Sequence, residues 1–166
     1  MPPRNRAQGR SNKHDMHVAL EPVNQPEIIA LIGELDAYQS ALYPSESNHF
    51  LDLTGLMQAN VLFAVARDGD RAALGCGAIM LLDGYAELKR MYVAPGARGR
   101  GIAKRLLEVL EEEALNSSRT VLRLETGIHQ PEALGLYERA GYVRRDAYGD
   151  YQHDPLSVYM EKRVVR

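Results

Sequence analysis

The chain has 166 residues, which is enough for one folded domain with a hydrophobic core of its own. Apolar residues make up 45% and charged residues 25%, as in ordinary soluble proteins, and the net charge of -2 argues against a dedicated nucleic-acid binder. The single cysteine, Cys76, excludes an intramolecular disulfide and a cysteine-rich zinc site, as is usual for a protein of the reducing cytosol. The sequence has no apolar run long enough to span a bilayer, so we expect a cytoplasmic protein that does not bind membranes.

The N-terminal segment is polar and shows neither helical nor strand periodicity. It carries four basic side chains, Arg4, Arg6, Arg10 and Lys13. We predict that residues 1–14 form a disordered basic tail, with a partner-binding arm as the alternative, and that residues 15–166 form a single domain.

The first periodic segment predicts a helix that starts near Pro26, a residue suited to a first helical turn. Apolar residues recur there at three- and four-residue spacing, at Ile28, Leu31, Ile32 and Leu35. Asn24 is the expected N-cap, and Tyr43-Pro44-Ser45 ends the helix. A short second helix or turn is expected to hold Phe50, Leu51, Leu53, Leu56 and Met57.

The pattern then changes to strands. Residues 61–66, 73–82 and 86–93 are expected to form an antiparallel meander, with turns at 68–70 and 83–84. A helix over 101–115, a strand over 121–124, a helix over 131–140 closed by Gly141, and two strands near 142–144 and 157–164 complete the chain. This order of elements predicts an α/β sandwich on a mixed sheet.

The densest chemical signal is a glycine- and arginine-rich turn between a strand and a helix, Val93-Ala94-Pro95-Gly96-Ala97-Arg98-Gly99-Arg100-Gly101-Ile102-Ala103. Glycines let backbone N–H groups approach a ligand closely, and the start of a helix adds unpaired N–H groups and partial positive charge. Four basic side chains surround it, Arg98, Arg100, Lys104 and Arg105. The turn therefore predicts a pyrophosphate site, with a tightly packed ordinary turn as the alternative.

Two commoner phosphate loops do not fit this turn. A Walker A loop needs lysine where Ile102 stands, and a dinucleotide fingerprint needs glycine where Lys104 stands.

Three segments together resemble a known family. Arg98-Gly99-Arg100-Gly101-Ile102-Ala103 is similar to [R/Q]-x-x-G-x-[G/A], the acetyl-coenzyme A loop of the GCN5-related N-acetyltransferases (GNAT superfamily) of the bacterial small-molecule type. Glu87–Pro95 resembles the fourth strand of that family, and Leu136-Tyr137-Glu138-Arg139-Ala140-Gly141-Tyr142 its L-Y-x-[KR]-x-G-[FY] segment. The resemblance implies one N-acetyltransferase domain over 15–166, with a mixed, mostly antiparallel sheet of about six or seven strands flanked by about four helices.

The resemblance also implies where the cosubstrate lies. The fourth strand would carry a bulge and splay from the fifth, with coenzyme A in the resulting V. Met91, Tyr92 and Val93 would contact its pantetheine arm, and the loop would hold its pyrophosphate, through Arg98, Gly99, Arg100, Gly101, Ile102, Ala103 and Lys104. Many members carry asparagine where this chain has His129-Gln130-Pro131. No metal is expected, because the histidines lack ligand spacing.

The catalytic roles implied are a general acid and a general base. Tyr137 matches the acid of the family; a phenol of pKa about 10 can protonate or hydrogen-bond a leaving thiolate whose pKa is about 8.5. The alternative for Tyr137 is a core aromatic residue. Glu87 sits where some members keep the base that an amine of pKa about 10 requires at neutral pH. Glu125, His129, a water relay, or a merely solvent-facing Glu87 are the alternatives.

The predicted function is direct transfer of acetyl, in a ternary complex, from acetyl-coenzyme A to a primary amine of a small molecule. The alternatives are a protein or peptide N-acetyltransferase and a non-catalytic acyl-coenzyme A-binding module. Acceptor contacts are expected in the segments least similar to the family, 38–50 and 148–154, with solvated loops as the alternative. The candidate substrate residues are Tyr43, Glu46, Asn48, Glu125 and His129. Cys76 is expected to be a core residue rather than an acetyl carrier. A homodimer is one possible assembly of the protein.

Overall fold

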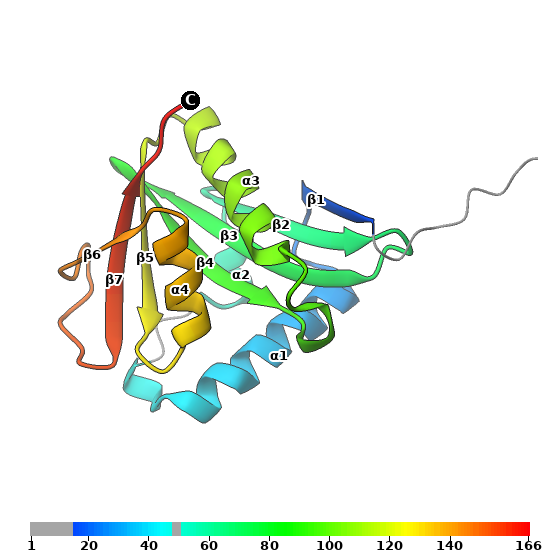
Figure 1. The fold of residues 1–166 in the computed structure, drawn as a ribbon, viewed down its shortest axis with the longest axis horizontal. Coiled ribbons are helices and arrows are strands. Elements are labelled where there is room, and N and C mark those ends of the chain that lie inside the picture. Colours follow the sequence, from blue (N-terminus) through cyan, green and yellow to red (C-terminus); the bar gives the residue numbers. More distant parts are fainter. Residues whose placement is uncertain (1–14, 48–50) are drawn as a thin grey trace, which may run out of the picture.

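The protein folds around one mixed sheet, shown in Figure 1 by a computed structural model that describes residues 15–47 and 51–166. The predicted tail, the candidate Asn48 and Phe50 lie outside the described residues. The strand order is β1-β2-β3-β4-β5-β7-β6, and β4 with β5 is the parallel pair among otherwise antiparallel neighbours. The mixed, mostly antiparallel fold predicted from the sequence is confirmed.

The elements follow the predicted order closely. The strands are β1 (Met16–Leu20), β2 (Val61–Asp68), β3 (Ala73–Leu82), β4 (Tyr85–Val93), β5 (Val121–Gly127), β6 (Val143–Arg145) and β7 (Ser157–Arg163). The helices are α1 (Pro26–Leu42), α2 (Leu53–Leu56), α3 (Ile102–Asn116) and α4 (Pro131–Arg139), with 3-10 turns η1 (Ser45–Ser47) and η2 (Pro95–Ala97).

Helices cover both faces of the sheet. Side chains alternate along β2, so that Ala64 and Ala66 pack in one core cluster while Phe63 and Val65 pack in another. The first cluster includes the apolar faces of α3 and α4, and the second includes those of α1 and α2. The sheet is therefore the middle layer of three, with α3 and α4 on one face and α1 and α2 on the other (Figure 1).

The N-terminal region differs from the prediction in two respects. β1, which the sequence did not predict, is a short strand that pairs with β2 at the edge of the sheet, where its partial burial leaves little apolar alternation. Asn24 was the wrong N-cap: Gln25 occupies that position, and its side chain donates to Glu21 rather than capping α1. Glu21 in turn accepts from the buried Arg67, which lowers the pKa of Glu21.

The feature that positions the site is the divergence of β4 from β5. The two strands pair only from Ala86–Leu88 to Leu122–Leu124, although β4 continues to Val93 and β5 to Gly127. β4 also carries a bulge opposite β3, at which Arg90 adopts a left-handed φ of 58°. Beyond the paired segment the strands separate and form the V that the resemblance implied.

Candidate functional site

Two adjoining cavities meet at this V. A large groove of about 1240 Å³ runs between the start of α3 and α4, and a small pocket of about 80 Å³ lies where β4 and β5 diverge. Met91, Gln130, Ala133 and Tyr137 line both. A ligand that fills the groove would therefore reach the mouth of the pocket at Tyr137.

The N-terminal end of α3 forms the far end of the large groove. Gly99 and Gly101 adopt left-handed φ angles of 79° and 76°, and a Cβ built on either glycine would meet no atom within 4 Å. Gly101 is the N-cap of α3 and supplies no side-chain cap. The open space beside uncapped N–H groups fits a pyrophosphate.

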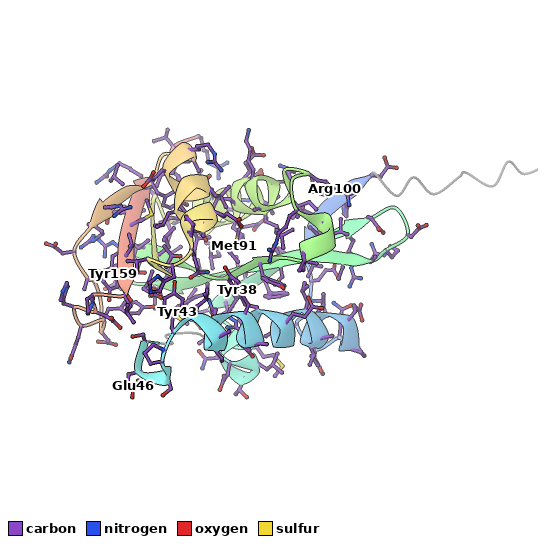
Figure 2. All side chains as sticks on the ribbon, turned by 60° about the horizontal axis from the view of Figure 1, so that its bottom comes forward. Tyr38, Tyr43, Glu46, Met91, Arg100 and Tyr159 are labelled. Atoms are coloured by element: carbon purple, nitrogen blue, oxygen red, sulfur yellow. The ribbon has the colours of Figure 1, made fainter. Side chains whose placement is uncertain are left out.

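The predicted cosubstrate residues converge on this groove with one exception. Those that line it are Met91, Tyr92, Val93, Arg98, Gly99, Gly101, Ile102, Ala103 and Lys104. The Arg98 guanidinium donates to the carbonyl of Val93 at 3.2 Å. Arg100 is exposed and does not line the groove, although it belongs to the same loop (Figure 2).

Tyr137 lies on α4 at the junction of the two cavities. Its ring is buried and packs edge-on against Tyr142, with centroids 5.7 Å apart. The Tyr137 hydroxyl makes no hydrogen bond within the part of the chain that the structure describes. Burial raises the pKa of Tyr137, and the negative charge of Glu125 raises it further. The phenol therefore stays protonated at neutral pH and is available as a hydrogen-bond donor.

Glu87 lines neither cavity, although it shares a face of β4 with the pocket residue Lys89. It is only 4% exposed, so it is not the solvent-facing residue that was one alternative. Its carboxylate accepts a hydrogen bond from Tyr148 and pairs with the Lys89 ammonium at 3.2 Å. The structure thus does not bring Glu87 together with Tyr137 in either cavity.

Glu125 does share a cavity with Tyr137. It follows Leu124, the last β5 residue paired with β4, and its side chain lines the small pocket. The carboxylate accepts a hydrogen bond from the Ser157 hydroxyl at 3.0 Å. A proton acceptor and a proton donor are therefore present at the same opening.

Tyr43 closes the pocket from the end of α1. Its hydroxyl accepts from the backbone N–H of His129 at 3.1 Å and donates to Gln130 at 3.3 Å. A Cβ at Gly127 would lie 1.7 Å from that hydroxyl, so this contact needs glycine at Gly127. Tyr43 lines the small pocket as one of its walls.

The other acceptor candidates lie farther out. His129 is exposed, stacks on the Tyr43 ring at 5.6 Å and lines the large groove rather than the pocket. Glu46 is exposed on η1, lines neither cavity, and points away from the sheet in Figure 2.

The structure joins the two segments expected to hold acceptor contacts. The Ser47 hydroxyl donates to Asp154 at 2.7 Å, and Leu156 lines the pocket opposite α1. Several pocket residues were not singled out from the sequence: Gln39, Ser47, Lys89, Arg90, Gln130 and Leu156. The signal available for Lys89 was its spacing of two residues from Glu87, which puts both side chains on one face of β4.

Other reactive groups contribute nothing at this site. Cys76 is buried, and burial raises the pKa of its thiol to about 12, so it is not poised as a nucleophile. Within the described residues, no three His, Cys, Asp or Glu side chains are grouped to hold a metal ion. Among the helices of that same part of the chain, none has the length and apolar character needed to cross a bilayer.

Comparisons with known proteins identify relatives of this chain. A family profile described as an acetyltransferase (GNAT) domain matches residues 59–144. The chain is 46% identical over 147 residues to the IAA acetyltransferase of Azospirillum brasilense, covering 87% of this chain and 95% of that one. A Klebsiella pneumoniae structure assigned as an acyl-CoA N-acyltransferase is 40% identical, with a TM-score of 0.78 and coverage of 92% and 99%. The PaiA N-acetyltransferase of Thermoplasma acidophilum, solved with coenzyme A, shares the fold at 16% identity, with a TM-score of 0.70 over 90% and 99% of the chains.

Proposed function

The chain belongs to the GNAT acetyltransferase family, and we propose that it transfers acetyl from acetyl-coenzyme A to the primary amine of a small molecule. The observation that carries the proposal is the junction at Tyr137, where a groove suited to a pyrophosphate-bearing cosubstrate opens into a small pocket with a carboxylate. The coenzyme A bound by the Thermoplasma relative supports the choice of cosubstrate.

The chain's own residues supply binding and orientation. The uncapped start of α3 and the side chains of Arg98 and Lys104 would hold the pyrophosphate. The unpaired edge of β4 from Met91 to Val93 would hold the pantetheine arm through backbone groups, which directs the thioester toward Tyr137. Such positioning raises the rate because the reacting groups meet already aligned.

Proton transfer follows from the two groups at the opening. An amine that attacks the thioester carbon must lose a proton, and the departing thiolate must gain one. We propose Tyr137 as the donor to sulfur and Glu125, directly or through water, as the acceptor from the amine. The sequence pointed to Glu87 as the acceptor; the shared cavity of Glu125 and Tyr137 supports Glu125 instead.

A small acceptor is favoured by the size of the pocket. A volume of about 80 Å³ holds a few non-hydrogen atoms around a primary amine rather than a folded protein surface. The name of the Azospirillum relative, IAA acetyltransferase, supports a small molecule. The tyrosine and glutamate at the junction favour catalysis over a purely binding module.

Thiol release from acetyl-coenzyme A should therefore depend on a small primary amine. The test measures free thiol across a panel of small amines and peptides, with the amine-free reaction as the baseline. Release with small amines and not with peptides is the expected result. Release confined to peptides would contradict the small acceptor, and binding of acetyl-coenzyme A without release for any amine would favour the binding module.

The matched variants Glu125→Gln and Glu87→Gln identify the proton acceptor. Glu125→Gln should lower kcat/KM at pH 7 about tenfold, below the usual range for a positioned base because water can carry the proton. The deficit should shrink as the pH approaches the amine pKa of about 10, where free amine no longer needs a base. Glu87→Gln should not show this pH dependence. The reverse pattern in pH–rate profiles would restore Glu87 as the base.

A further inference from the structure

The small pocket carries charges of both signs, on opposite sides of the V. Glu125 lies on β5 and Lys89 on β4, and both line the cavity at which Tyr137 ends the large groove. The reacting amine must face Glu125 and Tyr137 for its proton to be removed and for attack to occur. The remainder of a small acceptor then lies among the other pocket-lining residues, of which Lys89 and Arg90 of β4 are the cations.

The Lys89 ammonium is fixed before any acceptor arrives. It pairs with Glu87 at 3.2 Å, donates to the Tyr151 hydroxyl, and lies 5.1 Å from the centre of the Tyr151 ring. Both members of the ion pair are largely withdrawn from water, with 13% of the Lys89 side chain and 5% of the Glu87 side chain exposed. A cation held in this way loses little conformational entropy when it binds an anion, and salt in the solvent screens it weakly, although Glu87 already offsets part of its charge.

The sheet face around Lys89 is balanced in charge. Four carboxylates and four cations lie on it or beside it: Glu87, Glu125, Glu161 and Asp36 with Lys89, Arg123, Arg145 and Arg90, of which Arg90 also lines the pocket and pairs with Asp36 of α1. Arg123 and Arg145 each approach Glu161 at 2.6 Å, and they hold the pKa of Glu161 below its usual value. A guest with a net charge would upset this balance, whereas a zwitterion would place each of its charges beside an opposite one.

On the premise of the proposed function, we propose that the acceptor is a small amino acid-like zwitterion, with its amine at Glu125 and its carboxylate at Lys89. The pocket of about 80 Å³ limits the group between them to a few atoms. Lys89 thereby becomes a specificity-determining residue, and the Glu87 and Tyr151 contacts hold it in place.

Matched acceptors test the proposal with the unmodified enzyme. The probes are the protein amino acids, each compared with its carboxamide and with the amine left after removal of the carboxylate. For the preferred side chain, kcat/KM should be about 10- to 100-fold higher for the acid than for the carboxamide, the worth of one charge-assisted hydrogen bond. Amine reactivity favours the carboxamide, whose less basic amine is more deprotonated at pH 7, so a preference for the acid reports binding.

The matched variants Lys89→Met and Lys89→Arg test the anchor. Lys89→Met should remove most of the preference, because kcat/KM for the acid falls far more than for the carboxamide, mainly through KM. Lys89→Arg keeps the positive charge and should retain the preference. If Lys89→Met does not fold, the comparison of acceptors on the parent enzyme still decides the substrate class.

The outcomes separate the two proposals. No thiol release with any amine would overturn the proposed function. Release that is equal or faster for the carboxamides would overturn the zwitterionic acceptor and leave the acetyltransferase standing. A preference for the acid that survives intact in Lys89→Met would overturn the role of Lys89.

Discussion

Gly101→Glu is expected to abolish coenzyme A binding. Gly101 caps α3 with a left-handed φ of 76° and faces open space in the groove, where a glutamate would place bulk and negative charge at the proposed pyrophosphate position. We expect the affinity for coenzyme A, measured by calorimetry, to fall at least about 100-fold.

The control for this experiment is Gly84→Glu, in the turn between β3 and β4. Gly84 has a φ of 81°, and a Cβ there would also meet nothing within 4 Å, so this variant carries the same backbone strain, bulk and charge outside the groove. Gly84→Glu should bind coenzyme A like the parent. If the folded Gly101→Glu protein binds coenzyme A with the same affinity as this control, the pyrophosphate does not bind at the start of α3.

Tyr137→Phe is expected to lower the rate of acetyl transfer about 100-fold, the lower end of what a positioned acid supplies, because water can substitute in part. The variant keeps the ring that packs against Tyr142 and removes only a hydroxyl that makes no hydrogen bond among the described residues. Stability and coenzyme A affinity should therefore change little. Because product release can hide a slower chemical step, the measurement is the single-turnover rate.

The matched control is Tyr142→Phe. Tyr142 is the neighbouring ring and lines neither cavity; its hydroxyl donates at 3.2 Å to Glu111, which lines the large groove but not the small pocket. This variant also loses one buried hydroxyl and should keep the parent's transfer rate. Equal single-turnover rates for Tyr137→Phe and the parent would show that Tyr137 is a packing residue.

The arrangement of elements could be predicted from the sequence because each signal is local. Helices and strands repeat their apolar residues at different periods, so α1, α3, α4 and the β2–β4 meander were all predicted close to their observed bounds. The glycine-rich turn before α3 could likewise be predicted, because its glycines and basic residues are adjacent in the chain. β1 was not predicted, because an edge strand with one neighbour and partial burial shows little alternation of apolar and polar residues.

Which side chains meet at the opening was decided by the tertiary structure. Glu87 and Glu125 are both acidic residues on central strands, and alternation along a strand says which residues share a face but not where two strands part. The bulge at Arg90 and the end of β4–β5 pairing after Leu88 set that point. As a result, Glu125 lines the pocket with Tyr137, whereas Glu87 contacts Lys89 and Tyr148 and lines no cavity. The sequence could not decide this, because the point where the strands diverge depends on backbone pairing between segments more than thirty residues apart.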